Sequence, residues 1–152
     1  MRLVIYQPDI PQNTGTMLRT CACLGIGAAI VEPAAFDVSD RHFRRAGLDY
    51  LDHVDIERHA SFAAFEASRR ERGLRLVLAT TTGAVRYTDF AFGADDLIMV
   101  GRESAGVPES VHAAADARVA IPMRPDLRSL NVAVSAAMIL GEALRQTRWS
   151  AR

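Results

Sequence analysis

Short apolar runs alternate with amphipathic stretches along most of the chain. The apolar runs lie at residues 3–6, 28–31, 54–56, 76–79, 97–100 and 119–121. Their length and branched side chains predict six strands, and helices are predicted between them, for example after Asn13 and after Ser61, which can cap a first helical turn. Because short buried strands that alternate with helices form parallel sheets, we expect an α/β fold. The sheet should be mostly parallel and six-stranded, with helices flanking it and residues 1–152 making one domain.

The longest apolar stretch follows a loop that contains two prolines near the C-terminus. After Pro122 and Pro125, a helix is predicted over residues 130–146, with Ser129 as its N-cap. The helix carries no charged residue before Glu142, and apolar side chains cover nearly its whole circumference. Such a helix should have most of its faces buried, so we expect it to pack against its own domain and against a second subunit in a homodimer.

Three loops that follow predicted strands carry polar residues or glycines: residues 80–83, 101–108 and 122–131. In open parallel sheets, ligands bind at the carboxyl ends of the strands, where such loops meet. Gly101 and Gly106 allow the backbone to approach a ligand closely or to turn with a positive φ. Taken singly, each loop is also compatible with a plain strand-to-helix turn. The chain has no G-x-G-x-x-G motif, so a dinucleotide site is not expected.

Composition excludes some chemistry without identifying a function. The chain has 18 basic and 18 acidic residues, and this zero net charge gives no support to nucleic-acid binding. All basic residues are arginines, which excludes lysine Schiff-base and P-loop chemistry. Arginine grips phosphate with a planar fork, but a biased genome explains the arginine excess at least as well. The four histidines are scattered and the acidic residues are not clustered, so no metal site is predicted.

Nothing in the sequence indicates export or membrane insertion. Met1 and Arg2 lead directly into the first predicted strand, and no apolar run reaches the ~20 residues that a membrane span needs. Cys21 and Cys23 point in nearly opposite directions on a helix and cannot form a disulfide, so both are expected to be reduced and buried. We therefore expect a cytoplasmic protein without a membrane partner.

Three short motifs resemble those of one enzyme family. Ile-Pro-Met and Arg-Ser-Leu-Asn within residues 121–131, followed by a helix that ends Glu-Ala-Leu-Arg-Gln at 142–146, resemble the third motif of the SpoU branch of SPOUT methyltransferases. Asn-Thr-Gly at 13–15 with Arg19 resembles the first motif, and Glu103 matches the acidic residue of the second. The resemblance covers essentially the whole chain. It implies methyl transfer from S-adenosyl-L-methionine to a ribose 2′-hydroxyl in RNA, and a C-terminal trefoil knot that pattern rules do not predict.

The same resemblance implies which residues form the site. Contacts to S-adenosylmethionine, largely through backbone groups, are expected from Ala79, Gly101, Ile121 and Ser129. The catalytic residues that it implies are Arg19, Ser129 and Asn131. In this family Arg19 would be a base or a phosphate anchor, and we favour the anchor because a guanidinium holds its proton far above neutral pH. RNA contacts are expected from Asn13, Glu103, Arg41, Arg124 and Arg145.

Some positions keep a second interpretation or depart from the family pattern. Glu103 could instead cap the Pro108 region or pair with an arginine. Gly141 stands where the family commonly has an aromatic residue, and a glycine inside a helix can mark close approach of another helix in a dimer. Arg102 and Ser104 flank Glu103 where the short tRNA enzymes of the family differ. These departures concern RNA specificity more than the chemistry.

The length of the chain favours one substrate within the family. Larger SpoU enzymes usually carry an added RNA-binding domain, and none fits before Arg2 or after Arg152. The short enzymes methylate the wobble nucleotide, cytidine or uridine 34, of tRNA, so we expect this reaction, with surface arginines holding the anticodon stem-loop. The alternatives are the same chemistry on ribosomal RNA or at another tRNA position, and a non-catalytic flavodoxin-like or receiver module. The missing lysine argues against a receiver.

Overall fold

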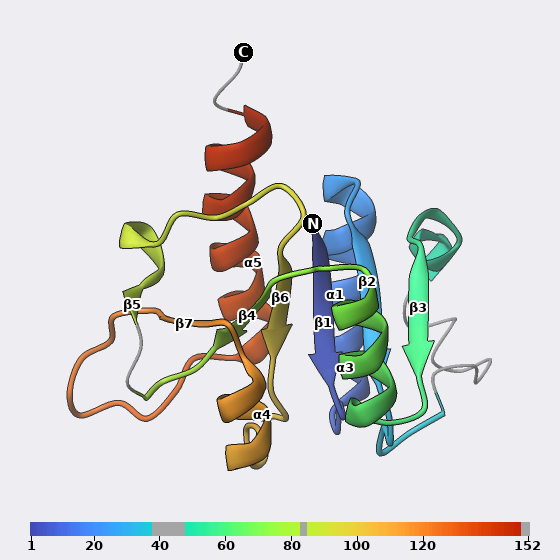
Figure 1. Cartoon of the computed structure of the whole chain (residues 1–152), viewed down its shortest axis with the longest axis horizontal. Helices are drawn as coiled ribbons and strands as arrows, with labels where there is room; N and C mark the ends of the chain where they lie inside the picture. The colour runs from blue at the N-terminus through green and yellow to red at the C-terminus, as the bar shows by residue number, and fades with distance from the viewer. Residues whose placement is uncertain (38–47, 83–84, 150–152) are drawn as a thin grey trace.

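The computed structural model describes residues 1–37, 48–82 and 85–149. Within these residues, seven parallel strands form one sheet in the order β3-β2-β1-β6-β4-β7-β5 (Figure 1). The strands are β1 (Arg2–Tyr6), β2 (Gly27–Val31), β3 (Ile56–His59), β4 (Leu76–Ala79), β5 (Val85–Arg86), β6 (Leu97–Val100) and β7 (Ala117–Ala120). The α/β class and the parallel sheet expected from the sequence are confirmed.

The described sheet has one strand more than the six predicted, and one predicted strand is shifted. The additional strand, β5, has only the two exposed residues Val85 and Arg86, so no apolar run marks it; its pairing with β7 defines it. The third predicted strand begins at Ile56 and continues in register with β2 to His59, whereas Val54 precedes it. Polar residues are tolerated there because β3 is an edge of the sheet.

Helices form a layer on each face of the sheet (Figure 1). One layer contains α1 (Pro11–Leu24) and α5 (Val132–Leu144), which continues as the π-helical turn η3 (Arg145–Trp149). The other contains α3 (Phe62–Glu71) and α4 (Glu109–Ala114), and η1 (Leu48–His53) and η2 (Tyr87–Asp89) are short 3-10 turns. Each layer covers its own apolar core, the first around Leu18 and Leu140 and the second around Phe65 and Leu78.

Both helices of the first layer begin at residues other than those predicted. Helix α1 begins at Pro11, where a missing N–H costs nothing, and Ile10 at its N-cap makes no side-chain hydrogen bond. Asn13 is therefore not the cap, and its side chain is free for other contacts. The cap of α5 is Asn131, whose Oδ1 accepts from the backbone N–H groups of Ala133 and Val134 at 2.9 and 3.2 Å. The prediction of Ser129 as the cap is wrong.

One buried arginine joins the second layer to the sheet. Arg69 is 4% exposed, and its guanidinium donates to the backbone oxygens of Leu74 and Ala114 and to Oδ2 of Asp116, at 2.7–3.0 Å. Asp116 Oδ2 also accepts from the backbone N–H of Leu76, the first residue of β4. A buried charge is tolerated only when it is paired and hydrogen-bonded, so this contact set fixes where the chain enters β7.

Helix α5 is less completely buried than its sequence suggests. Ile139 and Leu140 are at most 1% exposed in the core of their own chain, whereas Val134 and Met138 are 49% and 38% exposed. The expectation that most of its faces are covered therefore does not hold within a single chain. The two cysteines also differ, since Cys21 is buried and Cys23 is exposed, so the expectation that Cys23 is buried is wrong. Burial raises the pKa of the Cys21 thiol to about 12.

Two expectations stay predictions at this level. The short helix predicted to bear Arg41 lies outside the described residues. The C-terminal trefoil knot implied by the family resemblance is consistent with the parallel sheet but stays a prediction. Among the helices of the described ranges, none is both long enough and apolar enough to cross a bilayer.

Replacing Leu140 with alanine tests the place of α5 in the core. Leu140 is 0% exposed, so Leu140→Ala should leave a cavity and lower the free energy of unfolding by about 2–5 kcal/mol, measured by chemical denaturation. Leu127, which is 59% exposed, provides the control. Leu127→Ala should change the free energy of unfolding by less than about 0.5 kcal/mol. Similar effects of the two substitutions would contradict this packing.

Candidate cofactor and active site

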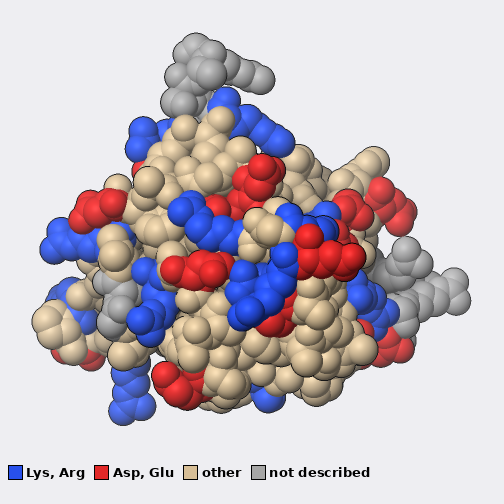
Figure 2. Space-filling model, in the orientation of Figure 1, with Lys and Arg blue, Asp and Glu red and all other residues tan. Residues whose placement is uncertain are grey.

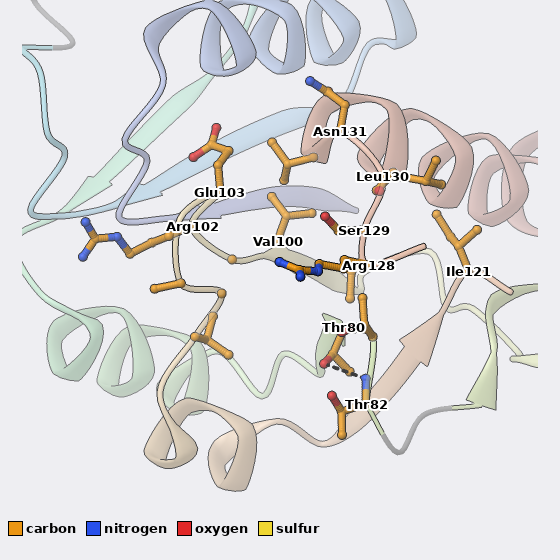
Figure 3. A pocket seen from close by; sticks show the side chains of 18 of the residues that line it. Thr80, Thr82, Val100, Arg102, Glu103, Ile121, Arg128, Ser129, Leu130 and Asn131 are labelled. Atoms are coloured by element: carbon orange, nitrogen blue, oxygen red, sulfur yellow. Dashed lines mark hydrogen bonds between the residues drawn. The ribbon is translucent and has the colours of Figure 1, made fainter. Parts of the chain in front are cut away.

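A cavity of about 640 Å³ opens at the carboxyl ends of β4, β6 and β7 (Figure 3). Its walls come from the three loops that follow these strands and from the start of α5. All four residues predicted to contact a cofactor line it, namely Ala79, Gly101, Ile121 and Ser129. Asn13, Glu103 and Asn131 line it too. Residues separated by more than 100 positions thus meet where the parallel sheet was expected to bind a ligand.

The loop after β6 depends on two glycines. Arg102 and Gly106 exchange backbone hydrogen bonds of 3.0 and 2.9 Å, which folds the loop back on itself. Gly106 has a φ of +63°, a conformation that glycine adopts readily and other residues rarely do. A Cβ atom on Gly101 would lie 2.8 Å from the backbone carbon of Gly106, so any side chain there would push the two backbones apart. The loop therefore presents main-chain groups to the cavity.

The loop after β4 contributes hydroxyl groups. The backbone N–H of Thr80 donates to the oxygen of Val119 at 2.9 Å, which extends the contact between β4 and β7 by one residue. The Thr80 hydroxyl in turn accepts from the backbone N–H of Thr82 at 3.3 Å. Figure 3 shows Thr80 and Thr82 on the same side of the cavity. This wall offers both backbone and hydroxyl groups to a polar ligand.

The loop between β7 and α5 brings one cation to the cavity. The Arg128 side chain extends across the pocket, close to Ser129 in the view of Figure 3. Arg128 makes no ion pair with any residue that the structure describes. Arg124, four residues earlier, lies away from the cavity and pairs with Asp126 at 3.1 Å. Arg128 was noticed in the sequence only as part of a motif, and its place in the cavity was not predicted.

A chain of side-chain hydrogen bonds joins residues of all three motifs. Asn13 Nδ2 donates to Glu103 Oε1 at 3.2 Å, and Asn131 Nδ2 donates to Asn13 Oδ1 at 3.0 Å. Since Asn131 also caps α5, these contacts tie the start of α1, the loop after β6 and the start of α5 together. The described hydrogen bonds use one hydrogen of each amide nitrogen. The second hydrogen of each remains available for an oxygen of a ligand.

Asp9 holds the loop that carries Glu103 through hydrogen bonds, and this role of Asp9 was not predicted from the sequence. Asp9 Oδ1 accepts from the backbone N–H of Glu103 at 3.2 Å, and the Ser104 hydroxyl donates to Oδ2. Arg102 Nε lies 3.7 Å from the same Oδ2. The alternative roles considered for Glu103, capping the Pro108 region or pairing with an arginine, are therefore replaced by contacts with Asn13 and Asp9. An acidic residue between two prolines was the one signal in the sequence that could have pointed to Asp9.

The two neighbouring carboxyl groups have opposite proton affinities. Hydrogen bonding with the Glu103 carboxyl lowers the pKa of Asp9 to about 2. Burial, and then the contact with Asp9, raise the pKa of Glu103. The Asp9 shift stabilises the fold above its ordinary pKa near 3.8, and this contribution is lost as the pH falls towards 2. The Glu103 shift contributes fully below the ordinary pKa of about 4.5, and this contribution is lost as the pH rises through the raised pKa of Glu103. Asp9 is thus the member of the pair that stays ionised near Arg102.

Three residues expected at the site do not line this cavity. Arg19 is exposed two turns after Asn13 on α1, with its guanidinium carbon 4.5 Å from the centre of the Tyr50 ring. Arg145 pairs with Glu142 at 2.7 Å, and Arg124 pairs with Asp126 as described above. Arg41, also expected to contact RNA, lies outside the described residues. The roles assigned to these four arginines stay predictions.

No side chains gather in a metal-binding arrangement in the described ranges. Groups of three or more histidine, cysteine, aspartate or glutamate residues that could hold an ion do not occur there. What the cavity offers is main-chain donors and acceptors, hydroxyls, two amides, one carboxyl group, one imidazole and two guanidinium groups. This set suits a neutral or zwitterionic organic ligand next to a phosphate-bearing one.

Comparison with known proteins agrees with this geometry. The model of the SpoU rRNA Methylase family matches residues 1–141. A tRNA (cytidine(34)-2′-O)-methyltransferase from Beijerinckia indica is 69% identical over 144 residues, 95% of this chain and 90% of that protein. A solved structure described as "Structural insights into the 2-OH methylation of C/U34 on tRNA" is 40% identical with a TM-score of 0.91, covering 99% of this chain and 97% of that chain.

A second solved structure contains the cofactor that the family resemblance implies. It is the SpoU methyltransferase AviRb from Streptomyces viridochromogenes in complex with AdoMet, which is 31% identical with a TM-score of 0.86. The match covers 99% of this chain but 61% of that chain. Together with the three motifs that meet at one cavity, these similarities show that the chain belongs to the SpoU rRNA Methylase family.

Proposed function

We propose that this chain methylates the ribose 2′-hydroxyl of the wobble nucleotide of tRNA, cytidine or uridine 34, in the cytoplasm, with S-adenosylmethionine as the methyl donor. The observation that carries the proposal is the meeting of all three motifs around one cavity at the carboxyl ends of β4, β6 and β7. The relatives that support the tRNA substrate are matched along nearly their whole length, 90% for the Beijerinckia indica protein. AviRb, by contrast, is covered over only 61% of its chain.

The cavity suits S-adenosylmethionine in size and in chemistry. Its volume of about 640 Å³ lies within the ~300–1,000 Å³ that small-molecule sites usually occupy. Main-chain groups at Ala79, Gly101 and Ile121 can hold a flat polar ring edge, while the side chain of Ile121 covers its apolar face. When bound, S-adenosylmethionine supplies a methyl group on a positively charged sulfur. No metal ion is needed for this transfer.

The polar chain of Asn13, Glu103 and Asn131 would hold the ribose. Each amide has one hydrogen left for an oxygen of the nucleotide, and Glu103 fixes the orientation of Asn13. Holding two reactants in line contributes roughly 7–11 kcal/mol to lowering a barrier, and removal of the hydroxyl proton by a base contributes about 10²–10⁴-fold in rate. The network supplies the positioning, and Ser129, beside Arg128 in the cavity, is placed to contact the same nucleotide.

Arg19 enters this scheme through a second subunit. It is exposed and does not line the cavity of its own chain, so a second chain would bring it to a nucleotide bound there. We place it there as the anchor of a phosphate, because a guanidinium is a poor base. The tRNA would then contact both subunits.

The homodimer is proposed to form along an exposed stripe of α5. Val134 and Met138 are 49% and 38% exposed, and their spacing of four residues puts them on one side of α5. Gly141, three residues further on, has open space where a Cβ atom would be, so a partner helix can approach closely. A stripe of this kind is typical of a subunit interface.

Substitution of Gly101 tests the cofactor site. A Cβ atom there would lie 2.8 Å from the backbone of Gly106, so Gly101→Ala should weaken S-adenosylmethionine binding at least tenfold, about 1.4 kcal/mol, measured by calorimetry. Arg70→Ala is the control because Arg70 is exposed on α3 and does not line the cavity, and it should bind as the wild type does. A chelator should change neither affinity. Wild-type affinity in Gly101→Ala, or binding that the chelator abolishes, would count against this site.

Mass spectrometry of tRNA tests the substrate. A strain without the gene should lack the 2′-O-methyl group at nucleotide 34, and wild type should restore it. Arg19→Ala should reduce the rate of methyl transfer on the order of 10²-fold or more and should not restore the methyl group in the strain. Arg70→Ala, at an exposed arginine paired with Glu66 on α3, should restore the methyl group fully. An unchanged wobble nucleotide together with a methyl group missing from ribosomal RNA would favour the alternative substrate.

Light scattering tests the interface. Val134→Glu and Met138→Glu place charges on the exposed stripe and should convert the dimer to monomers. Each loses up to about half of the roughly 1.5–3 kcal/mol that full burial of such a side chain contributes, and each adds the cost of burying a charge. Substitutions at Ile139 or Leu140 would report on folding instead, because both lie in the core. Val85→Glu, at a residue that is 51% exposed on β5, is the control. A soluble Met138→Glu protein that keeps the mass of a dimer would refute this interface.

A further inference from the structure

The arginines of this neutral chain are mostly neutralised within the fold. In the described ranges, nine of them pair with carboxylates: Arg2, Arg58, Arg69, Arg70, Arg72, Arg75, Arg102, Arg124 and Arg145. Arg148 donates to backbone oxygens, and Arg19 stacks on Tyr50. Among the described arginines, Arg86, Arg118 and Arg128 have no such partner, and all three are exposed. A chain with zero net charge can attract an anion only where such cations remain free.

Arg86 and Arg118 lie on the same face of the sheet. In the pairing of β5 with β7, Arg86 is opposite Ala120, and Arg118 is two residues before Ala120 on the same strand. Because side chains alternate along a strand, both arginines point away from the face of Val119, which belongs to the core under α1 and α5. Strand spacing and rise place the two positions roughly 8 Å apart.

The face that carries these arginines continues towards the cavity. Arg118 is opposite Leu78 of β4, which lies in the core under α3 and α4. The two arginines therefore lie where that core ends. β7 runs directly into Ile121 at the cavity, where Arg128 also reaches. Figure 2, in the orientation of Figure 1, shows basic side chains over the end of the molecule where β5 and β7 lie.

The carboxylates closest to these arginines along the chain are engaged elsewhere. Asp116 is held by Arg69 and by the backbone of Leu76, and Asp126 is held by Arg124. Asp89, in η2, accepts from the Thr88 hydroxyl. Like charges on neighbouring strands destabilise a sheet, so two free arginines at this spacing are unfavourable until an anion lies between them.

We infer that Arg86 and Arg118 form a phosphate-binding strip that holds the backbone of the RNA substrate beside the cavity. The inference rests on the proposed function, because it concerns how the same substrate is held. Guanidinium groups suit phosphodiesters, which they grip with two parallel hydrogen bonds, and the strip leads from the edge of the sheet to the reacting nucleotide. The strip thereby supplies a local electrostatic attraction for RNA in a chain whose net charge is zero.

The double variant Arg86→Gln/Arg118→Gln tests the strip. Its affinity for unmodified tRNA, measured by filter binding at several salt concentrations, should fall about tenfold or more at low salt. The slope of log affinity against log salt should decrease by about 1–2, since each lost phosphate contact removes roughly 0.7–0.9. KM for tRNA should rise while kcat at saturating tRNA and the affinity for S-adenosylmethionine stay near the wild-type values.

Two further variants separate charge from structure. Arg86→Lys/Arg118→Lys keeps both charges and should retain most of the binding. Arg58→Gln removes an arginine from β3, the opposite edge of the sheet, and should leave the salt slope unchanged. A wild-type KM and salt slope in the glutamine double variant would overturn the inference, as would a lower melting temperature that accounts for its loss of binding.

The binding test of the strip and the methylation test of the proposed function can fail independently. If the wild type transfers no methyl group to tRNA, the proposed reaction is wrong, whereas the salt slope with unmodified tRNA still decides whether the strip binds RNA. If wild-type protein binds vesicles of anionic phospholipid, and the glutamine double variant loses that binding but binds tRNA as well as the wild type does, the strip is a membrane-binding surface and the inference is overturned.

Discussion

The two hydrogen bonds of the Asn13 side chain hold the site together. Asn13 donates to Glu103, 90 positions away, and accepts from Asn131, 118 positions away. Asn131 in turn caps α5, so the start of one helix orients the start of another through a single amide. If one of these hydrogen bonds were removed, a side chain of the network would lose a partner. An unpaired polar group in a part-buried place costs about 1–3 kcal/mol. The loops of the cavity therefore depend on one another.

The cavity itself is made mainly of backbone. Gly101 and Gly106 let two main-chain segments approach within a distance that no side chain would permit, and β4, β6 and β7 end at the same edge because they are parallel. A site of this kind can be lined by residues with no reactive group, such as Ala79 and Ile121. Chemistry then comes from a few polar groups at one side, and Asp9 fixes the position of Glu103 among them.

The ability of this protein to bind an anion depends on where its unpaired arginines lie and not on its net charge. Most of the described arginines are paired within the fold, and Arg69 shows what such pairing achieves, since it fixes the entry to β7. Of the cations left over, Arg118 lies two residues after Asp116 on this strand, Arg86 lies beside the far end of the strand, and Arg128 lines the cavity. A neutral chain can thus present a local positive surface, and the same accounting distinguishes a structural arginine from one that is free for a ligand.

The sequence by itself determined the alternation of strands and helices, the parallel sheet and the loops that form the cavity, because apolar runs and prolines act locally. It placed Ala79, Gly101, Ile121 and Ser129 at the cavity through motif resemblance. Tertiary structure alone decided three further matters. β5 has no pattern of its own and exists only by pairing with β7. The exposed stripe of α5 could not be separated from its buried face, because nearly every position before Glu142 is apolar and only packing distinguishes them. Asp9 contacts Glu103 at the cavity, while Arg19 does not line the cavity of its own chain, because side-chain contacts between distant segments follow from how the chain folds and not from spacing along it.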